Sequence, residues 1–111
     1  MDRLSVASSG LAVASTQLAV AAHNVANANT QGFVPARVEV REAPEGGAEA
    51  RIELGMPERA AEVDRALLAP SRSDLVAETV SQSVAAALYR ANLASLRTAQ
   101  ETDEALFDLV R

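Results

Sequence analysis

Apolar residues recur every seven positions along the first quarter of the chain. Leucine or valine occupies one heptad position, and alanine occupies the position three residues later. The first set is Leu4, Leu11, Leu18 and Val25, and the second is Ala7, Ala14, Ala21 and Ala28. This spacing predicts a helix that packs lengthwise against another helix.

A second apolar column, Val6, Val13 and Val20, lies about 200° around the same helix from the first. One partner helix cannot cover two opposed faces. Residues 4–36 also contain no charged side chain, whereas a surface helix normally has one charged face. Either this is the central helix of a small bundle, or it is shared among several subunits. The shortness of the remaining chain favours the second interpretation.

The middle of the chain alternates with a period of two. Val38 and Val40 lie between charged residues, as do Ala50 and Ile52, and a Gly-rich turn at 43–48 separates the two runs. This pattern predicts a short β-hairpin with one apolar face. Residues 57–69 fit either a helix of two or three turns or an ordered linker, and the sequence does not separate these.

Residues 75–110 contain no Pro or Gly, which predicts a second helix about 54 Å long. Ser71 or Ser73 is the expected N-cap, with Asp74 in the first turn. Apolar stripes again lie on two sides of this helix. One stripe includes Leu75, Tyr89, Leu93, Leu96, Phe107 and Val110, and the other includes Val80, Val84, Ala87, Ala91 and Ala94.

The predicted fold class is therefore mainly α. Long N- and C-terminal helices are expected to pair as an antiparallel coiled-coil hairpin with a short β-hairpin insertion between them. One structural domain is expected, comprising an N-terminal helix with its Asn-rich motif (1–31), the insertion (32–72) and a C-terminal helix (73–111).

Charge and composition exclude several function classes. The net charge is −5 and the basic residues are scattered, so nucleic acid is not an expected partner. No polybasic face is present for an anionic membrane. The chain has no cysteine, which excludes disulfides and thiolate metal sites. Polar residues interrupt the N-terminal apolar segment, so neither a cleaved signal peptide nor direct membrane insertion is expected.

Candidate catalytic groups are sparse. His23 is the only histidine, and no carboxylate lies within a helical turn of it, so a metal site is not expected. Ser8 and Ser9 have no nearby base. Gly46 and Gly47 lack the spacing and context of a phosphate-binding loop. We therefore expect no enzyme activity, no cofactor and no metal.

Three asparagines lie where the first helix should end, in the stretch NVANANTQGF. Asn27 and Asn29 are expected to stop the helix, since Asn tolerates the left-handed conformation and its amide reaches unpaired backbone groups. Gly32 is expected to take a positive φ and reverse the chain, and Phe33 to anchor the exit. Asn24 lies within the helix, where its amide could bond a neighbouring helix.

These residues carry a family resemblance. The helix ending in HNVANANTQGF resembles the signature of the bacterial flagellar basal-body rod and hook proteins, roughly N-[IVL]-A-N-x-x-T-x-G-[FY]. The segment YRANLASLRTAQETDEALFDLV resembles that family's C-terminal pattern Y-x-A-N-x-x-x-[LI]-x-T-[AV]. The matching residues are Asn24, Val25, Ala26, Asn27, Thr30, Gly32 and Phe33 in the first motif, and Tyr89, Ala91, Asn92, Leu96, Thr98 and Ala99 in the second. Among its members, the chain most resembles the proximal-rod type.

The resemblance implies a structural subunit that polymerises through its terminal helices into the helical drive shaft of a motile flagellum. Its partners would be copies of itself, other flagellar rod and axial proteins, and the type III export apparatus, which would export it unfolded without a cleaved signal peptide. It would reside in the basal-body rod, which spans the periplasm.

The expected packing places the leucine column of the first helix on the C-terminal helix and the other stripes on neighbouring subunits. Buried amides of Asn24, Asn27 and Asn92 would fix the register. The predicted assembly residues are Leu4, Leu11, Leu18, Val25, Asn24, Asn27, Asn29, Thr30, Gly32, Phe33, Tyr89, Asn92, Leu93, Leu96 and Thr98. A soluble adaptor or export chaperone that binds a partner helix in an apolar groove is the alternative, but it does not account for the Asn motifs.

Overall fold

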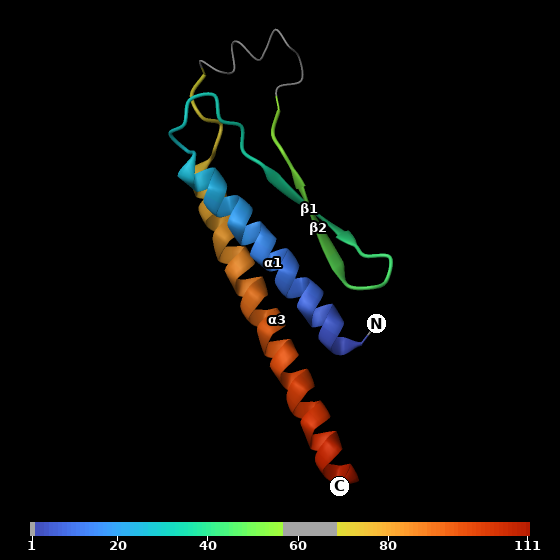
Figure 1. Cartoon of the computed structure of the whole chain (residues 1–111). Coiled ribbons are helices and arrows are strands. Elements are labelled where there is room, and N and C mark those ends of the chain that lie inside the picture. Colours follow the sequence, from blue (N-terminus) through green and yellow to red (C-terminus); the bar gives the residue numbers. More distant parts are fainter. Residues whose placement is uncertain (1, 57–68) are drawn as a thin grey trace.

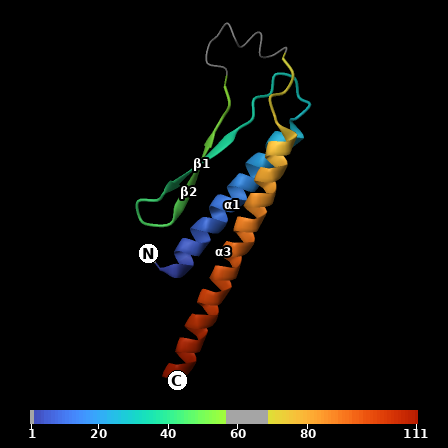
Figure 2. The same cartoon turned by 180° about the vertical axis from the view of Figure 1, so that it is seen from behind.

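Two long helices lie side by side and run in opposite directions in the computed structural model, which describes residues 2–56 and 69–111 (Figures 1 and 2). Helix α1 spans Arg3–Ala26 and α3 spans Leu75–Val110, while strands β1 (Arg37–Glu42) and β2 (Ala48–Glu53) form a hairpin beside α1. The predicted mainly helical fold, with two paired helices and a β-hairpin between them, is confirmed. The possible helix at 57–69 falls almost wholly outside the described residues.

Helix α1 begins at an aspartate cap and ends at Asn27. The Asp2 carboxylate accepts hydrogen bonds from the backbone N–H groups of Leu4 and Ser5, at 2.6 and 3.0 Å. At the other end, the Asn27 backbone N–H and side-chain Nδ2 both donate to the carbonyl of His23, at 3.2 and 2.9 Å. Asn27 has a φ of −100°, and every described residue with positive φ is a glycine. Asn27 therefore ends the helix as predicted, through its amide and without a left-handed conformation.

Helix α3 is capped by Asp74, and not by Ser71 or Ser73 as the sequence suggested. The Asp74 carboxylate accepts from the N–H groups of Val76 and Ala77, at 3.0 and 3.2 Å. Ser71 accepts instead from the backbone of Ser73, at 3.2 Å. A carboxylate near the positive end of the helix dipole is also favoured over a hydroxyl, which explains the choice.

The hairpin places its apolar residues on one face. Its antiparallel register pairs Val38 with Ile52 and Val40 with Ala50 across the two strands. Ser9 of α1 joins the hairpin to the helix, because its Oγ accepts a hydrogen bond from the backbone N–H of Ala48 at 3.1 Å. The apolar face of the hairpin nevertheless stays half exposed.

An ion pair lies on the charged face of the hairpin. The Arg41 guanidinium and the Glu39 carboxylate are 2.8 Å apart. The hydrogen bond and the charge of Glu39 raise the pKa of Arg41 above its ordinary value. Both side chains are open to solvent, so this pair contributes little to stability.

The molecule is elongated and has a thin core. Its extents are 69 × 27 × 14 Å and its radius of gyration is 19.1 Å, against roughly 13 Å for a compact domain of about this size. The buried apolar residues of the described chain are Ala7, Val13, Ala14, Ala21, Ala36 and Ala85. Because alanine buries little apolar surface, this core stabilises the single chain only weakly.

Helix α3 is longer than α1 by about 18 Å and extends beyond the start of α1 (Figure 1). Arg3, at the start of α1, lines a shallow hollow with Thr98 and Thr102 of α3. Residues 103–110 therefore lie past the end of α1, and we refer to them as the α3 overhang.

Candidate assembly interface

The contact between α1 and α3 follows a seam of small residues. Ala7, Ala14 and Ala21 are buried along one line of α1, and Gly10 lies between them against Asn92 of α3. Small side chains let the two helix backbones approach closely. The leucine column expected at the centre of this contact lies at its edge instead. Leu4, Leu11 and Val25 are half-buried, and Leu18 is 39% exposed.

Gly10 packs directly against the side chain of Asn92. A Cβ atom built on Gly10 would lie 2.7 Å from Asn92 Cγ and 2.9 Å from its Nδ2, well inside ordinary contact. The Asn92 amide is held by a hydrogen bond from Nδ2 to the carbonyl of Leu88 at 2.9 Å. Asn92 belongs to the C-terminal sequence motif, whereas Gly10 was not predicted as an assembly residue. A glycine in the interior of a helix lowers the stability of the helix by about 0.5–1 kcal/mol relative to alanine. Its presence at position 10 is therefore a sequence feature that could have indicated a close contact.

Replacing Gly10 by alanine is expected to lower the free energy of unfolding by roughly 1–3 kcal/mol, because the added methyl group overpacks the seam. In an isolated helix the same change would stabilise by about 1 kcal/mol, so the sign of the effect identifies the contact. Urea unfolding followed by circular dichroism measures it. The double variant with Asn92→Ala should recover most of the loss, and a stabilising Gly10→Ala would contradict the close approach.

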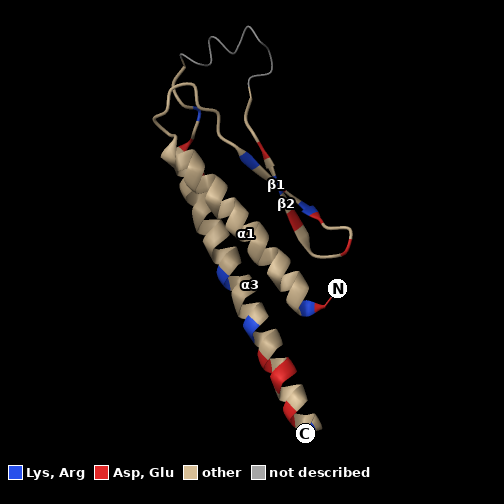
Figure 3. Ribbon diagram, viewed as in Figure 1, with Lys and Arg blue, Asp and Glu red and all other residues tan. Residues whose placement is uncertain are grey.

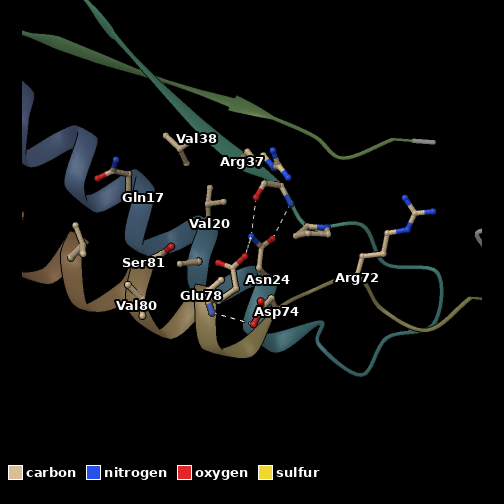
Figure 4. A pocket seen from close by; sticks show the side chains of 15 residues that line it. Gln17, Val20, Asn24, Arg37, Val38, Arg72, Asp74, Glu78, Val80 and Ser81 are labelled. Atoms are coloured by element: carbon tan, nitrogen blue, oxygen red, sulfur yellow. Dashed lines mark hydrogen bonds between the residues drawn. The ribbon is translucent and has the colours of Figure 1, made fainter. Parts of the chain in front are cut away.

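Asn24 joins three parts of the chain and is almost fully buried, with 1% exposure. Its Nδ2 donates to the carbonyl of Ala36 at 2.8 Å and to Glu78 Oε1 at 3.0 Å, and its Oδ1 accepts from the Ala36 N–H at 2.9 Å (Figure 4). These bonds use both hydrogens and the oxygen of the amide. One side chain thus holds α1, the entry to β1 and the first turn of α3 together.

The turn that follows α1 lies against the segment that precedes α3. Gly32, with a φ of 75°, donates its N–H to the carbonyl of Ala69 at 2.7 Å. The backbone N–H of Arg72 donates to the carbonyl of Phe33 at 3.0 Å, and the Phe33 ring meets the edge of His23 at 5.6 Å between centroids. The positive φ of Gly32 agrees with expectation, and these contacts hold the start of α3 beside the end of α1.

The other sequence-selected residues lie at the margins. Thr30 donates its hydroxyl to the Asn27 side chain at 3.2 Å, and Asn29 is exposed beyond the helix end. On α3, Leu93 and Leu96 are half-buried, Tyr89 is exposed, and the exposed Thr98 bonds the carbonyl of its own helix at Ala94. The structure therefore gathers Asn24, Gly32 and Phe33 at one end of the helix pair and Asn92 midway along it. Their part in assembly stays a prediction.

Residues 4–33 match the family model for the flagella basal body rod protein. This segment is similar to the flagellar basal-body rod protein family. The matched residues comprise most of α1, the Asn24 cluster and the turn to Phe33, whereas the C-terminal motif lies outside them. A comparison with curated proteins gives no match. The match supports a structural role in the flagellar rod, within the basal body and in assembly with other rod proteins.

The rod family is not a family of enzymes. Among residues 2–56 and 69–111, no group of three or more His, Asp or Glu side chains is placed to hold a metal ion. Helix α1 is long and apolar enough to cross a membrane, with a mean hydropathy of 1.4 over its most apolar window. These features are shared by membrane spans, signal sequences and packed helices of assemblies. The prediction that α1 does not insert in a membrane stays a prediction.

Large apolar side chains are exposed along both helices of the described chain. They are Val6, Leu18, Leu75, Val76, Val80, Val84, Leu88, Tyr89, Leu106, Phe107, Leu109 and Val110. Extended apolar surfaces of this kind mark sites of protein association. The surface that the helix pair leaves open is therefore the candidate assembly interface.

Proposed function

We propose that this rod protein is a structural subunit that polymerises through α1 and α3 into the helical drive shaft of the flagellar basal body. The family match at residues 4–33 carries the proposal. In this role the chain performs no catalysis. It transmits torque through many parallel helix contacts, each of them modest.

The distribution of apolar side chains supports polymerisation. The single chain buries mainly alanines, while its valines, leucines and Phe107 stay largely open to water. Fully burying one such large side chain contributes about 1.5–3 kcal/mol, so neighbouring copies that cover them would add more stability than the core of one copy does. The elongated shape also suits side-by-side packing.

We further propose that the chain is exported unfolded by the flagellar type III apparatus, without a cleaved signal peptide, and assembles with other axial proteins in the rod. A thin core supports this route, since a weakly stable chain unfolds at little cost before export. The small-residue seam and the Asn24 bonds would then form again when the exported subunit refolds in the rod.

Detergent-resistant basal bodies purified from the producing cells are expected to contain the rod protein, detected by antibody. Its signal should follow the basal-body fraction through a density gradient, and it should disappear from that fraction in cells without the other rod components. A chain found only in the soluble fraction, bound to a single partner, would contradict the rod assignment and favour the adaptor or chaperone alternative.

A further inference from the structure

The α3 overhang carries both apolar and acidic side chains with nothing packed on them. Its four large apolar residues, Leu106, Phe107, Leu109 and Val110, are 57–86% exposed. Asp103, Glu104 and Asp108 lie on the same segment, which forms the acidic end of α3 in Figure 3. These carboxylates make no ion pair within the described chain.

A groove of about 570 Å³ lies near the other end of the helix pair, between α1, the start of β1 and the first turns of α3 (Figure 4). Apolar side chains from all three elements line it, namely Val20, Val38, Val80 and Val84. Among these, Val80 and Val84 are more than half exposed. The groove therefore offers an apolar surface of the kind that the overhang requires.

The groove is lined by two arginines and two carboxylates, and the arginines, Arg37 and Arg72, have no ion-pair partner in the described chain. Its two carboxylates are already engaged within the chain. Asp74 accepts two backbone hydrogen bonds as the cap of α3, and Glu78 accepts from the Asn24 amide.

We propose that the α3 overhang of one copy docks in this groove of the next copy, with its apolar residues against the valines and its carboxylates near Arg37 and Arg72. The occupant is a second copy of this chain, because the overhang carries apolar residues that match the valines of the groove and carboxylates that can pair with its two arginines. Since the two surfaces lie at opposite ends of the molecule, each contact leaves one groove and one overhang free, and the series grows as an open filament. This inference rests on the proposed rod function, and it specifies the contact between successive copies of the chain along the rod.

Cysteine cross-linking tests the contact, because the natural chain has no cysteine. Val80→Cys and Leu106→Cys are combined in one chain, expressed in its own cells and oxidised with copper phenanthroline in purified basal bodies. The two positions lie about 39 Å apart along one helix, and a disulfide requires Cα atoms within about 7 Å. Any bond between them must join two molecules, and a ladder of dimers and larger multimers is expected.

The matched control moves the groove cysteine two turns along α3, with Leu88→Cys in place of Val80→Cys, since Leu88 is exposed but outside the groove. Chains with only one of the two cysteines are a further control, because they can form a disulfide only where the same residue of two copies meets. A ladder from the control pair as strong as that from the groove pair would overturn the proposal. So would a cross-link only to a protein of different mass, or no cross-link from a chain that is present in basal bodies. A chain absent from basal bodies would instead reject the proposed function itself.

Charge reversal provides a second measurement. Arg37→Glu combined with Arg72→Glu is expected to lower the yield of the Val80–Leu106 cross-link by roughly fivefold or more. Arg90→Glu combined with Arg97→Glu makes the same change in net charge outside the groove and should leave the yield unchanged. Equal yields from the two pairs would show that the groove arginines do not hold the overhang.

Discussion

Replacing Asn24 by leucine is expected to lower the free energy of unfolding of the chain by roughly 3–5 kcal/mol, because each buried polar group left without a partner costs about 1–3 kcal/mol. The Ala36 N–H and carbonyl both lose their partner in a buried site, and Glu78 loses its donor. A loss of this size is a large share of the 5–15 kcal/mol that stabilises an ordinary domain. Denaturant unfolding followed by far-ultraviolet circular dichroism measures it.

Two further variants make this test specific. Asn29→Ala, at an exposed position of the same motif, should change the stability by less than about 0.5 kcal/mol. Asn24→Asp keeps an acceptor for the Ala36 N–H but sets a carboxylate beside Glu78. Repulsion makes its penalty larger at neutral pH than in acid, where one of the two carboxyl groups is protonated. An unchanged unfolding midpoint for Asn24→Leu would show that the Asn24 bonds are not needed for the fold.

Replacing Leu11 by aspartate is expected to abolish rod assembly and swimming while leaving expression and export measurable. Leu11 is half-buried at the edge of the α1–α3 seam, within a segment that has no charge from residue 4 to 36. In one molecule the new carboxylate can still reach water. Between packed copies it would be buried without a partner, and desolvating an ion costs several kcal/mol. Every subunit contact would carry that cost.

Swimming in soft agar and recovery of the chain in basal bodies provide the two readouts for Leu11→Asp. Leu11→Met is the matched control, because a volume-conserving apolar exchange usually costs less than about 1.5 kcal/mol and should preserve motility. Normal swimming of the Leu11→Asp strain would reject the assembly role of the leucine column.

Local features of the chain predicted most of the secondary structure. The period-seven pattern of the first helix, the alternation around Val38 and Ile52, and the break-free run at 75–110 each depend on near neighbours in sequence. The N-cap of α3 was less predictable, because several neighbouring residues could cap the helix. Asp74 caps α3 ahead of two nearby serines, since several residues in a row carried a suitable oxygen. The amide of Asn27, by contrast, bonds the helix backbone at the end of α1 as predicted.

By itself, the sequence determined two long helices with apolar residues on two sides and a hairpin between them. It also determined that the first helix ends in an asparagine motif. Only the tertiary structure decided which side of α1 meets α3. A heptad pattern reveals apolar columns but not which of them the partner helix covers. The alanine column of α1 lies at the contact because small side chains allow the two helix backbones to approach more closely. Asn24 likewise meets Glu78 across 54 residues of chain, and Gly10 meets Asn92. Contacts at such separations arise from how the helices pack in space, which local periodicity does not encode.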